Sequence, residues 1–279
     1  MEYNPSLLVS ADFLLTAAIL RHFEKQRVST ANRLYALTEF PRHKDWGMHL
    51  PESFPDVIWF TQALDQISGR EEEQVDTLTS MYNESPLAKV TAQYKGLGPG
   101  KLVARFLGET GDPYLQISGF TKDGEEITEP RPRTFSQLKS YCGMAPSGGK
   151  LPVNTSGSQS SFSARARVRL WLISDQLVKQ HDGTFHPVFL AGAEKYAGES
   201  HRGWKQVREV AEGVTVKRER WSDAQFGVIG RKRARVLVGV GILRVLYEEA
   251  RRLHDPEAHA AALADRERTA AEAAKIVLA

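Results

Sequence analysis

The stretch Tyr94-Lys95-Gly96-Leu97-Gly98-Pro99-Gly100-Lys101-Leu102-Val103-Ala104-Arg105-Phe106-Leu107 joins two segments of helical character through a glycine-rich turn. A Gly-apolar-Gly turn between helices leaves backbone N–H groups facing outward at the start of the second helix, where the helix dipole favours an anion. Leu97 is expected to insert between the two helices, and Ala104 to let them approach closely. The stretch therefore predicts a helix-hairpin-helix unit that can hold a phosphate.

The candidate nucleic-acid-binding residues of this turn are Lys95, Gly96, Gly98, Gly100 and Lys101. The two lysines bracket the turn with positive charge, and glycine lets a nucleic-acid backbone come close to the protein backbone. An ordinary turn between helices that is rich in glycine is the alternative. A dinucleotide-binding turn is disfavoured because no apolar strand precedes the glycines.

Helical periodicity extends to both sides of the turn and predicts a mainly α fold. Before it, two amphipathic segments, 6–37 and 56–81, are joined by a proline-rich stretch and predict an antiparallel helical hairpin or coiled coil. Further helices are expected over 87–94, 101–107, 135–142, 164–178 and 236–253, with an alanine-rich one after Pro256. A short β-hairpin or an irregular insertion is expected over 114–132, and a mixed basic segment without assigned structure follows His181-Asp182-Gly183 and extends to about Arg235.

These segments group into three units. Residues 1–92 form the helical arm, residues 93–178 the helix-hairpin-helix domain with its long polar loop, and residues 179–279 a basic segment with C-terminal helices. The apolar residues expected to face inward include Ile58 in the arm and Val168 and Leu172 in the helix over 164–178.

Composition describes a folded protein of 279 residues, with 41% hydrophobic residues, 25% charged residues and a formal net charge of +3. Cys142 is the only cysteine, which excludes an intrachain disulfide, predicts a buried structural thiol and favours the reducing cytoplasm. No membrane span is expected, because the most apolar stretch, 236–246, is short and contains Arg244.

Basic residues are clustered rather than spread along the chain. Arginine suits phosphate because its planar guanidinium group can donate two hydrogen bonds at once. One set lies around the polar loop, and its members are Arg131, Arg133, Lys139, Lys150, Arg165, Arg167 and Arg169. A second set surrounds Trp221 and consists of Lys217, Arg218, Arg220, Arg231, Lys232, Arg233 and Arg235. Of these, Lys150, Arg165, Arg167 and Arg169 are the further candidate nucleic-acid-binding residues.

The segment 146–163 consists mainly of Ser, Gly, Asn and Pro, which predicts a loop that faces solvent or a ligand. A serine on such a loop, beside lysine and arginine, could attack a phosphodiester while the cations stabilise charge on the phosphoryl oxygens. A merely flexible loop is the alternative. The spacing of the acidic residues and histidines predicts no metal site, so no cofactor is expected in this chain.

The order of these motifs resembles the IS one-ten family of bacterial insertion-sequence transposases, which are recombinases that work with a structured guide RNA. The segment 25–37 resembles the family's helical arm, 96–112 its glycine hairpin, and 135–146 its short helix that ends in Gly-x-x-Pro. The resemblance implies a catalytic serine, placed at Ser147 or Ser156, in a domain that cleaves DNA and exchanges strands.

In that family, the serine domain cooperates with an N-terminal RNase H-like domain whose acidic residues bind Mg²⁺. This chain begins almost at the helical arm, so we expect that domain to be missing, and the chain to be truncated or to act with acidic residues of another chain. The expected partners are DNA, a guide RNA and a second copy bound through the arm. A non-catalytic DNA-binding subunit of repair or chromosome maintenance, and a helical scaffold without nucleic-acid affinity, are the alternatives.

Overall fold

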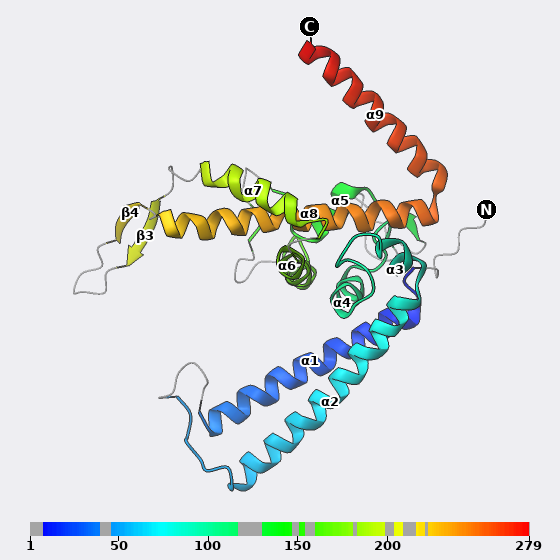
Figure 1. Cartoon of the computed structure of the whole chain (residues 1–279). Coiled ribbons are helices and arrows are strands. Elements are labelled where there is room, and N and C mark those ends of the chain that lie inside the picture. The colour runs from blue at the N-terminus through cyan, green and yellow to red at the C-terminus, as the bar shows by residue number, and fades with distance from the viewer. Residues whose placement is uncertain are drawn as a thin grey trace.

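The computed structural model describes residues 8–39, 46–116, 130–146, 151–153, 160–180, 183–198, 204–208, 216–220 and 223–278. In these residues the fold is mainly helical, as the sequence predicts (Figure 1). The helices are α1 (Ala11–Leu37), α2 (Pro55–Glu84), α3 (Pro86–Thr91), α4 (Lys101–Thr110), α5 (Phe135–Tyr141), α6 (Ala164–Val178), α7 (His186–Gly198), α8 (Asp223–His254) and α9 (Pro256–Leu278). The strands form two antiparallel pairs, β1 (Leu115–Gln116) with β2 (Arg131–Pro132) and β3 (Trp204–Arg208) with β4 (Val216–Arg220).

Helices α1 and α2 lie side by side as a long arm that leaves the body of the protein (Figure 1). The N-cap Ser10 accepts a hydrogen bond from the Phe13 backbone N–H at 3.1 Å, which starts α1, and Pro55 starts α2 at a position where proline is tolerated. Along the arm, Arg27 of α1 donates to Glu71 of α2 at 2.6 Å. The predicted helical hairpin is therefore present.

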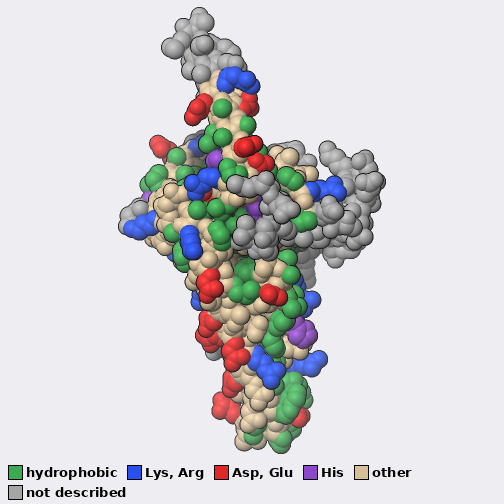
Figure 2. All heavy atoms as spheres, turned by 90° about the vertical axis from the view of Figure 1, so that its right-hand side faces the viewer, with side chains coloured by type: hydrophobic (Ala, Val, Ile, Leu, Met, Phe, Trp, Pro, Cys, Tyr) green, Lys and Arg blue, Asp and Glu red, His purple; other side chains and the backbone are tan. Residues whose placement is uncertain are grey.

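The far end of the arm carries exposed apolar side chains. Trp46, Met48 and Trp59 are exposed by 59%, 66% and 61% of their surface, and Figure 2 shows hydrophobic side chains at the lower end of the arm. Ile58, which we expected to face inward, is 43% exposed there. That prediction was wrong because helical spacing identifies an apolar stripe but does not show whether another element covers it.

Helix α8 runs through the body of the protein, and α3, α5, α6 and α7 pack against it (Figure 1). Its buried face includes Ile242, Leu243, Leu246 and Ala250, none of which is exposed to solvent. Burying four such side chains in close packing stabilises the fold through the hydrophobic effect. The hydrophobic core therefore lies between α8 and the helices around it.

Three expectations in the second half of the chain need correction. Helix α8 begins at Asp223 rather than Val236, and α7 occupies part of the segment without assigned structure. Lysine and arginine are good helix formers, so a basic run can continue a helix that is buried further along. In α6, Val168 and Leu172 are 57% and 40% exposed, because the face carrying Leu170 contacts α8 instead.

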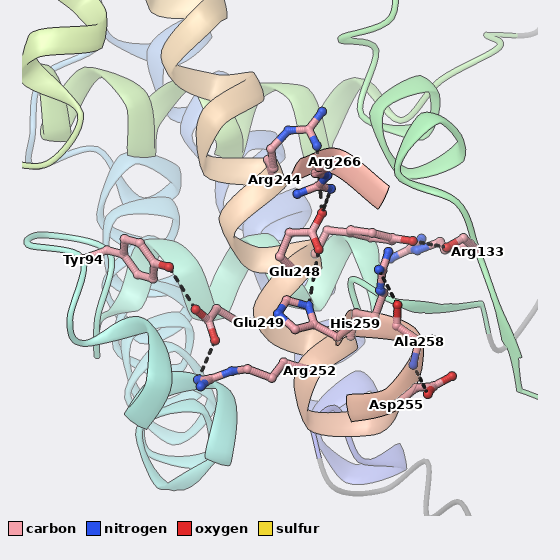
Figure 3. Close-up of polar contacts among 12 residues, drawn as sticks. Tyr94, Arg133, Arg244, Glu248, Glu249, Arg252, Asp255, Ala258, His259 and Arg266 are labelled. Atoms are coloured by element: carbon pink, nitrogen blue, oxygen red, sulfur yellow. Dashed lines mark hydrogen bonds and ion pairs between the residues drawn. The ribbon is translucent and has the colours of Figure 1, made fainter. Parts of the chain in front are cut away.

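Helix α9 leaves the body at an elbow after α8 (Figure 1). The Glu248 carboxylate of α8 forms an ion pair with Arg266 of α9 and lies 3.5 Å from His259 Nδ1 of α9, and Arg244 of α8 approaches the same carboxylate at 3.9 Å (Figure 3). The Arg251 guanidinium also donates to the backbone oxygen of Ala258 at 2.7 Å. These contacts hold the first turns of α9 at a fixed angle to α8.

Cys142 is fully buried, as predicted, and burial raises the pKa of its thiol to about 12. A thiol with so high a pKa is protonated at neutral pH and unreactive as a nucleophile. Among the described residues, no helix has both the length and the apolar character needed to cross a membrane.

Candidate nucleic-acid interface

The glycine-rich turn, which we call the hairpin, connects α3 to α4. The Leu97 side chain has no exposed surface, and its backbone N–H donates to the Tyr94 carbonyl oxygen at 2.8 Å. Ala104, in the first turns of α4, is also fully buried. Both side chains are buried, as the predicted roles of Leu97 and Ala104 require, and α4 packs against α6, α2 and α1.

Glycine is present at the three positions of the turn for different structural reasons. Gly96 has a φ of 85°, and a Cβ there would collide with Gln180 and Leu177 of the α6 end. A Cβ at Gly98 would lie 2.9 Å from the Ala92 Cα atom, which is too close. Internal packing therefore accounts for both of these glycines.

Gly100 differs because the fold does not require a glycine there. It is the N-cap of α4, its backbone is extended with φ 165° and ψ 155°, and the nearest atom to an added Cβ is the Gly98 oxygen at 3.9 Å. A glycine N-cap has no side chain to accept from the first N–H groups of the helix, and no side-chain hydrogen bond caps α4. The first N–H groups of a helix have no intrahelical partner, and the positive end of the helix dipole favours an anion beside them.

Two lysines flank this helix start, as the sequence predicts. Lys101 is the first residue of α4 and Lys95 precedes Gly96 in the turn, and both side chains are exposed. An exposed ammonium group is a point charge that suits phosphate oxygens on a polyanion. The hairpin thus combines uncapped backbone donors, a helix dipole and two cations on one turn.

A buried carboxylate fastens the hairpin to α8. Glu249, only 7% exposed, accepts from the Tyr94 hydroxyl at 2.9 Å and from the Gln93 amide at 3.1 Å, and pairs with Arg252 at 2.7 Å (Figure 3). Burial, followed by the contact with Glu249, raises the pKa of Tyr94, so its hydroxyl remains a donor at neutral pH. This anchor could not be predicted from the sequence because Glu249 is 155 residues away from Tyr94.

The three arginines of α6 have different environments. Arg165 is exposed and lines a hollow of about 460 Å³ together with Arg21, Lys25 and Asn32 of α1. Arg167 donates to the Pro152 carbonyl oxygen at 2.6 Å and stacks over Phe162 with 5.0 Å to the ring centroid. Arg165 is therefore the one of these three that faces solvent without a described intramolecular hydrogen bond.

Arg169 forms an ion pair with Glu24 of α1, and Arg105 of α4 pairs with the same carboxylate. Burial alone would raise the pKa of Glu24, but the hydrogen bonds and charges of the two arginines outweigh it and lower that pKa. Arg169 therefore serves to join α6 to the arm, and a phosphate would have to displace Glu24 to reach it.

Arg133, counted in the sequence analysis among the basic residues around the polar loop, is buried. It is 7% exposed, and its guanidinium donates to the backbone oxygens of Pro113 at 3.0 Å, Thr110 at 3.3 Å and Asp112. Its assignment to a phosphate-facing cluster was wrong, because a run of basic residues does not show which one turns inward. Arg131, two residues earlier on β2, is exposed.

Next to Arg133, Asp112 and His254 form a buried pair that the sequence analysis also missed. One Asp112 oxygen accepts from the backbone N–H groups of Tyr114 and Leu115 at 2.8 and 3.0 Å, and the other lies 2.6 Å from His254 Nε2. Both side chains are essentially inaccessible to solvent. The pair fastens the segment after α4 to the C-terminal end of α8. It thereby helps to fix the position of α4.

The hairpin and Arg165 lie at different places on the molecule. Gly96 packs against Leu177 and Gln180 at the C-terminal end of α6, whereas Arg165 is in its first turn. Twelve residues of helix separate Arg165 from Leu177, which corresponds to about 18 Å. The structure therefore does not bring the predicted nucleic-acid-binding residues together at one point.

The candidate catalytic residues Ser147 and Ser156, and the candidate phosphate contact Lys150, lie outside the described residues. Within the described part of the chain, no group of three or more His, Cys, Asp or Glu residues is arranged to hold a metal ion. Comparisons of this chain with protein-family models, with curated proteins and with solved structures gave no match.

Proposed function

We propose that this protein binds DNA through the α3–α4 hairpin, with the backbone N–H groups at the start of α4 contacting a phosphate and with Lys95 and Lys101 beside it. Contacts of this kind hold the protein on the DNA backbone without reading its sequence. Arg165 of α6 is a further exposed cation that lies outside the hairpin.

The observation that carries this proposal is Gly100. Internal packing explains Gly96 and Gly98, but at Gly100 a side chain would fit, and a Ser, Asp or Asn would cap α4 at least as well as glycine. An uncapped helix start between two exposed lysines leaves its donors available for a ligand. A phosphate group matches both the donors and the charge.

The proposal is tested with Gly100→Asp, compared with the nearly isosteric Gly100→Asn. Both side chains cap α4, so we expect the free energy of unfolding to stay the same or to rise by a few tenths of a kcal/mol. The Asp carboxylate also occupies the phosphate position and repels DNA, so Gly100→Asp should weaken duplex binding by about tenfold or more. Gly100→Asn should weaken it less.

These outcomes are measured by fluorescence anisotropy of a labelled 20-base-pair duplex and by chemical denaturation. If Gly100→Asp binds the duplex as tightly as the wild-type protein does, the start of α4 is not the phosphate site. If both variants lose stability, the N-cap geometry described above is wrong.

We further propose that the protein acts in DNA transposition or recombination, with Ser147 or Ser156 as the nucleophile, Mg²⁺ held by an RNase H-like partner and a guide RNA as a second partner. The ordered motifs from the helical arm through the hairpin to the Gly-x-x-Pro segment support this proposal.

The recombination proposal predicts nicking of insertion-end DNA in the presence of guide RNA, Mg²⁺ and a full-length partner. Loss of nicking with Ser147→Ala or Ser156→Ala identifies the serine. An absence of nicking by the wild-type protein under these conditions rejects catalysis and favours a non-catalytic DNA-binding subunit.

A further inference from the structure

The β3–β4 ribbon and the first described turns of α8 form a strongly basic end of the molecule. Figure 1 shows the ribbon at the N-terminal end of α8, with α7 lying along the same part of the helix. Residues 204–208, 216–220 and 223–235 contain nine lysines and arginines but only two acidic residues. The basic residues are Lys205, Arg208, Lys217, Arg218, Arg220, Arg231, Lys232, Arg233 and Arg235, and the acidic ones are Glu219 and Asp223.

The ribbon has the register of a regular antiparallel pair, in which Gln206 is opposite Arg218 and Arg208 is opposite Val216. Positions two apart along a strand are on the same face, so these two pairs place Arg208 and Arg218 at register positions of one face. A two-stranded ribbon has the width to enter the major groove of B-form DNA. The major groove of A-form RNA is too deep and narrow to admit one.

Three further basic residues lie just over two turns into α8. Arg231, Lys232 and Arg233 are all exposed, and because they are consecutive they project around the helix on several sides. Within the described part of the chain, no carboxylate lies within ion-pair distance of Arg231 or Lys232. Their charges are therefore available to a polyanion.

An aromatic side chain lies among these cations. Helix α7 packs closely on α8, since a Cβ at Gly192 would be 3.0 Å from Leu237 Cδ1. That approach brings Tyr196 beside Arg233, whose guanidinium carbon is 5.6 Å from the ring centroid, while the Lys195 ammonium is 6.0 Å from it. Cations interleaved with aromatic rings are typical of nucleic-acid-binding surfaces.

This surface is distinct from the hairpin. The hairpin is fastened to α8 at Glu249, which is 26 residues beyond the start of the helix at Asp223. That separation corresponds to about 39 Å along the helix axis. A single phosphate contact cannot account for both surfaces.

We propose that the β3–β4 ribbon and the Arg231–Arg233 turn of α8 form a second contact surface for duplex DNA, in which the ribbon enters the major groove and the α8 turn contacts the flanking phosphates. The proposal rests on the DNA binding proposed above and adds a surface that the hairpin does not include. It identifies the partner as B-form duplex rather than folded RNA.

The test uses two double variants of the whole chain, Arg231→Glu/Lys232→Glu at the α8 turn and Arg208→Glu/Arg218→Glu in the ribbon. Each is expected to weaken binding to a 20-base-pair duplex at least about fifty-fold at 0.1 M salt, and to make the log-log salt slope shallower by about 2. The matched control is Arg70→Glu/Arg268→Glu, which makes the same charge change at exposed positions of α2 and α9 and should bind like the wild-type protein. Circular dichroism of each variant verifies that the helices remain folded.

The outcomes separate this proposal from the hairpin proposal. If both double variants bind the duplex as the control does while Gly100→Asp weakens binding, the second surface is rejected and the hairpin proposal stands. If they weaken binding while Gly100→Asp does not, the hairpin proposal fails and the second surface stands. A loss confined to a double-stranded RNA probe also overturns the duplex-DNA assignment.

Discussion

Replacing Arg133 by methionine is expected to lower the free energy of unfolding by about 3–5 kcal/mol, the cost of removing one partner from a buried polar cluster. The guanidinium satisfies three backbone oxygens around the end of α4, and it lies close enough to Asp112 for their charges to attract. Burial lowers the pKa of Arg133, while Cys142 and Asp112 act in the opposite direction. Methionine fills similar space but donates no hydrogen bond, so the three oxygens lose their partner.

The measurement is denaturant unfolding followed by circular dichroism, and the matched control is Arg131→Met. Arg131 has the same side chain two residues away on β2, but it is exposed, so its replacement should change stability by less than about 0.5 kcal/mol. Equal losses in the two variants would show that Arg133 does not support the segment after α4 as described.

Reversing both hairpin lysines, as Lys95→Glu/Lys101→Glu, is expected to weaken duplex binding by about fifty-fold or more at 0.1 M salt. Each phosphate contact contributes about 0.9 to the slope of log affinity against log salt concentration, so losing two contacts removes nearly two decades of affinity at that salt concentration. The new carboxylates also repel the DNA. Because both lysines are exposed, the free energy of unfolding should change little.

Much of the fold follows from local sequence signals. The predicted bounds of α6 agree with the structure, because Ser163 caps its first turn by accepting from the Ala166 backbone N–H, and a polar loop precedes it. The two arm helices were predicted within a few residues of their observed bounds. The burial of Leu97 was also predictable, since a glycine-rich turn with a single leucine leaves that leucine few positions other than the core.

The remaining features depend on contacts between segments far apart in the chain. The exposed positions of Val168 and Leu172 follow from where α8 lies, and no spacing within α6 reveals this. Likewise, Glu249 is buried only because Tyr94 and Gln93 reach it from the hairpin. Helical periodicity identifies apolar stripes, whereas buried polar networks need the positions of both partners.

The candidate site was predictable only in part. The sequence indicated which residues of the turn could contact a phosphate, but not that Gly96 and Gly98 are required by packing whereas Gly100 is not. The engagement of Arg169 by Glu24 was equally hidden, since 145 residues separate the two. The structure therefore narrows the hairpin site to the start of α4 and its two lysines.

The most direct test of DNA binding through the hairpin is the salt dependence of duplex affinity for the wild-type protein and for Lys95→Glu/Lys101→Glu. The same 20-base-pair duplex is titrated at salt concentrations from about 50 to about 200 mM. Over this range, phosphate contacts dominate the change in affinity. The account predicts weaker binding by the variant and a slope shallower by about 2, with Arg70→Glu/Arg268→Glu behaving like the wild-type protein. Identical slopes and affinities for all three proteins, or no binding by the wild-type protein at the lowest salt concentration, would contradict it.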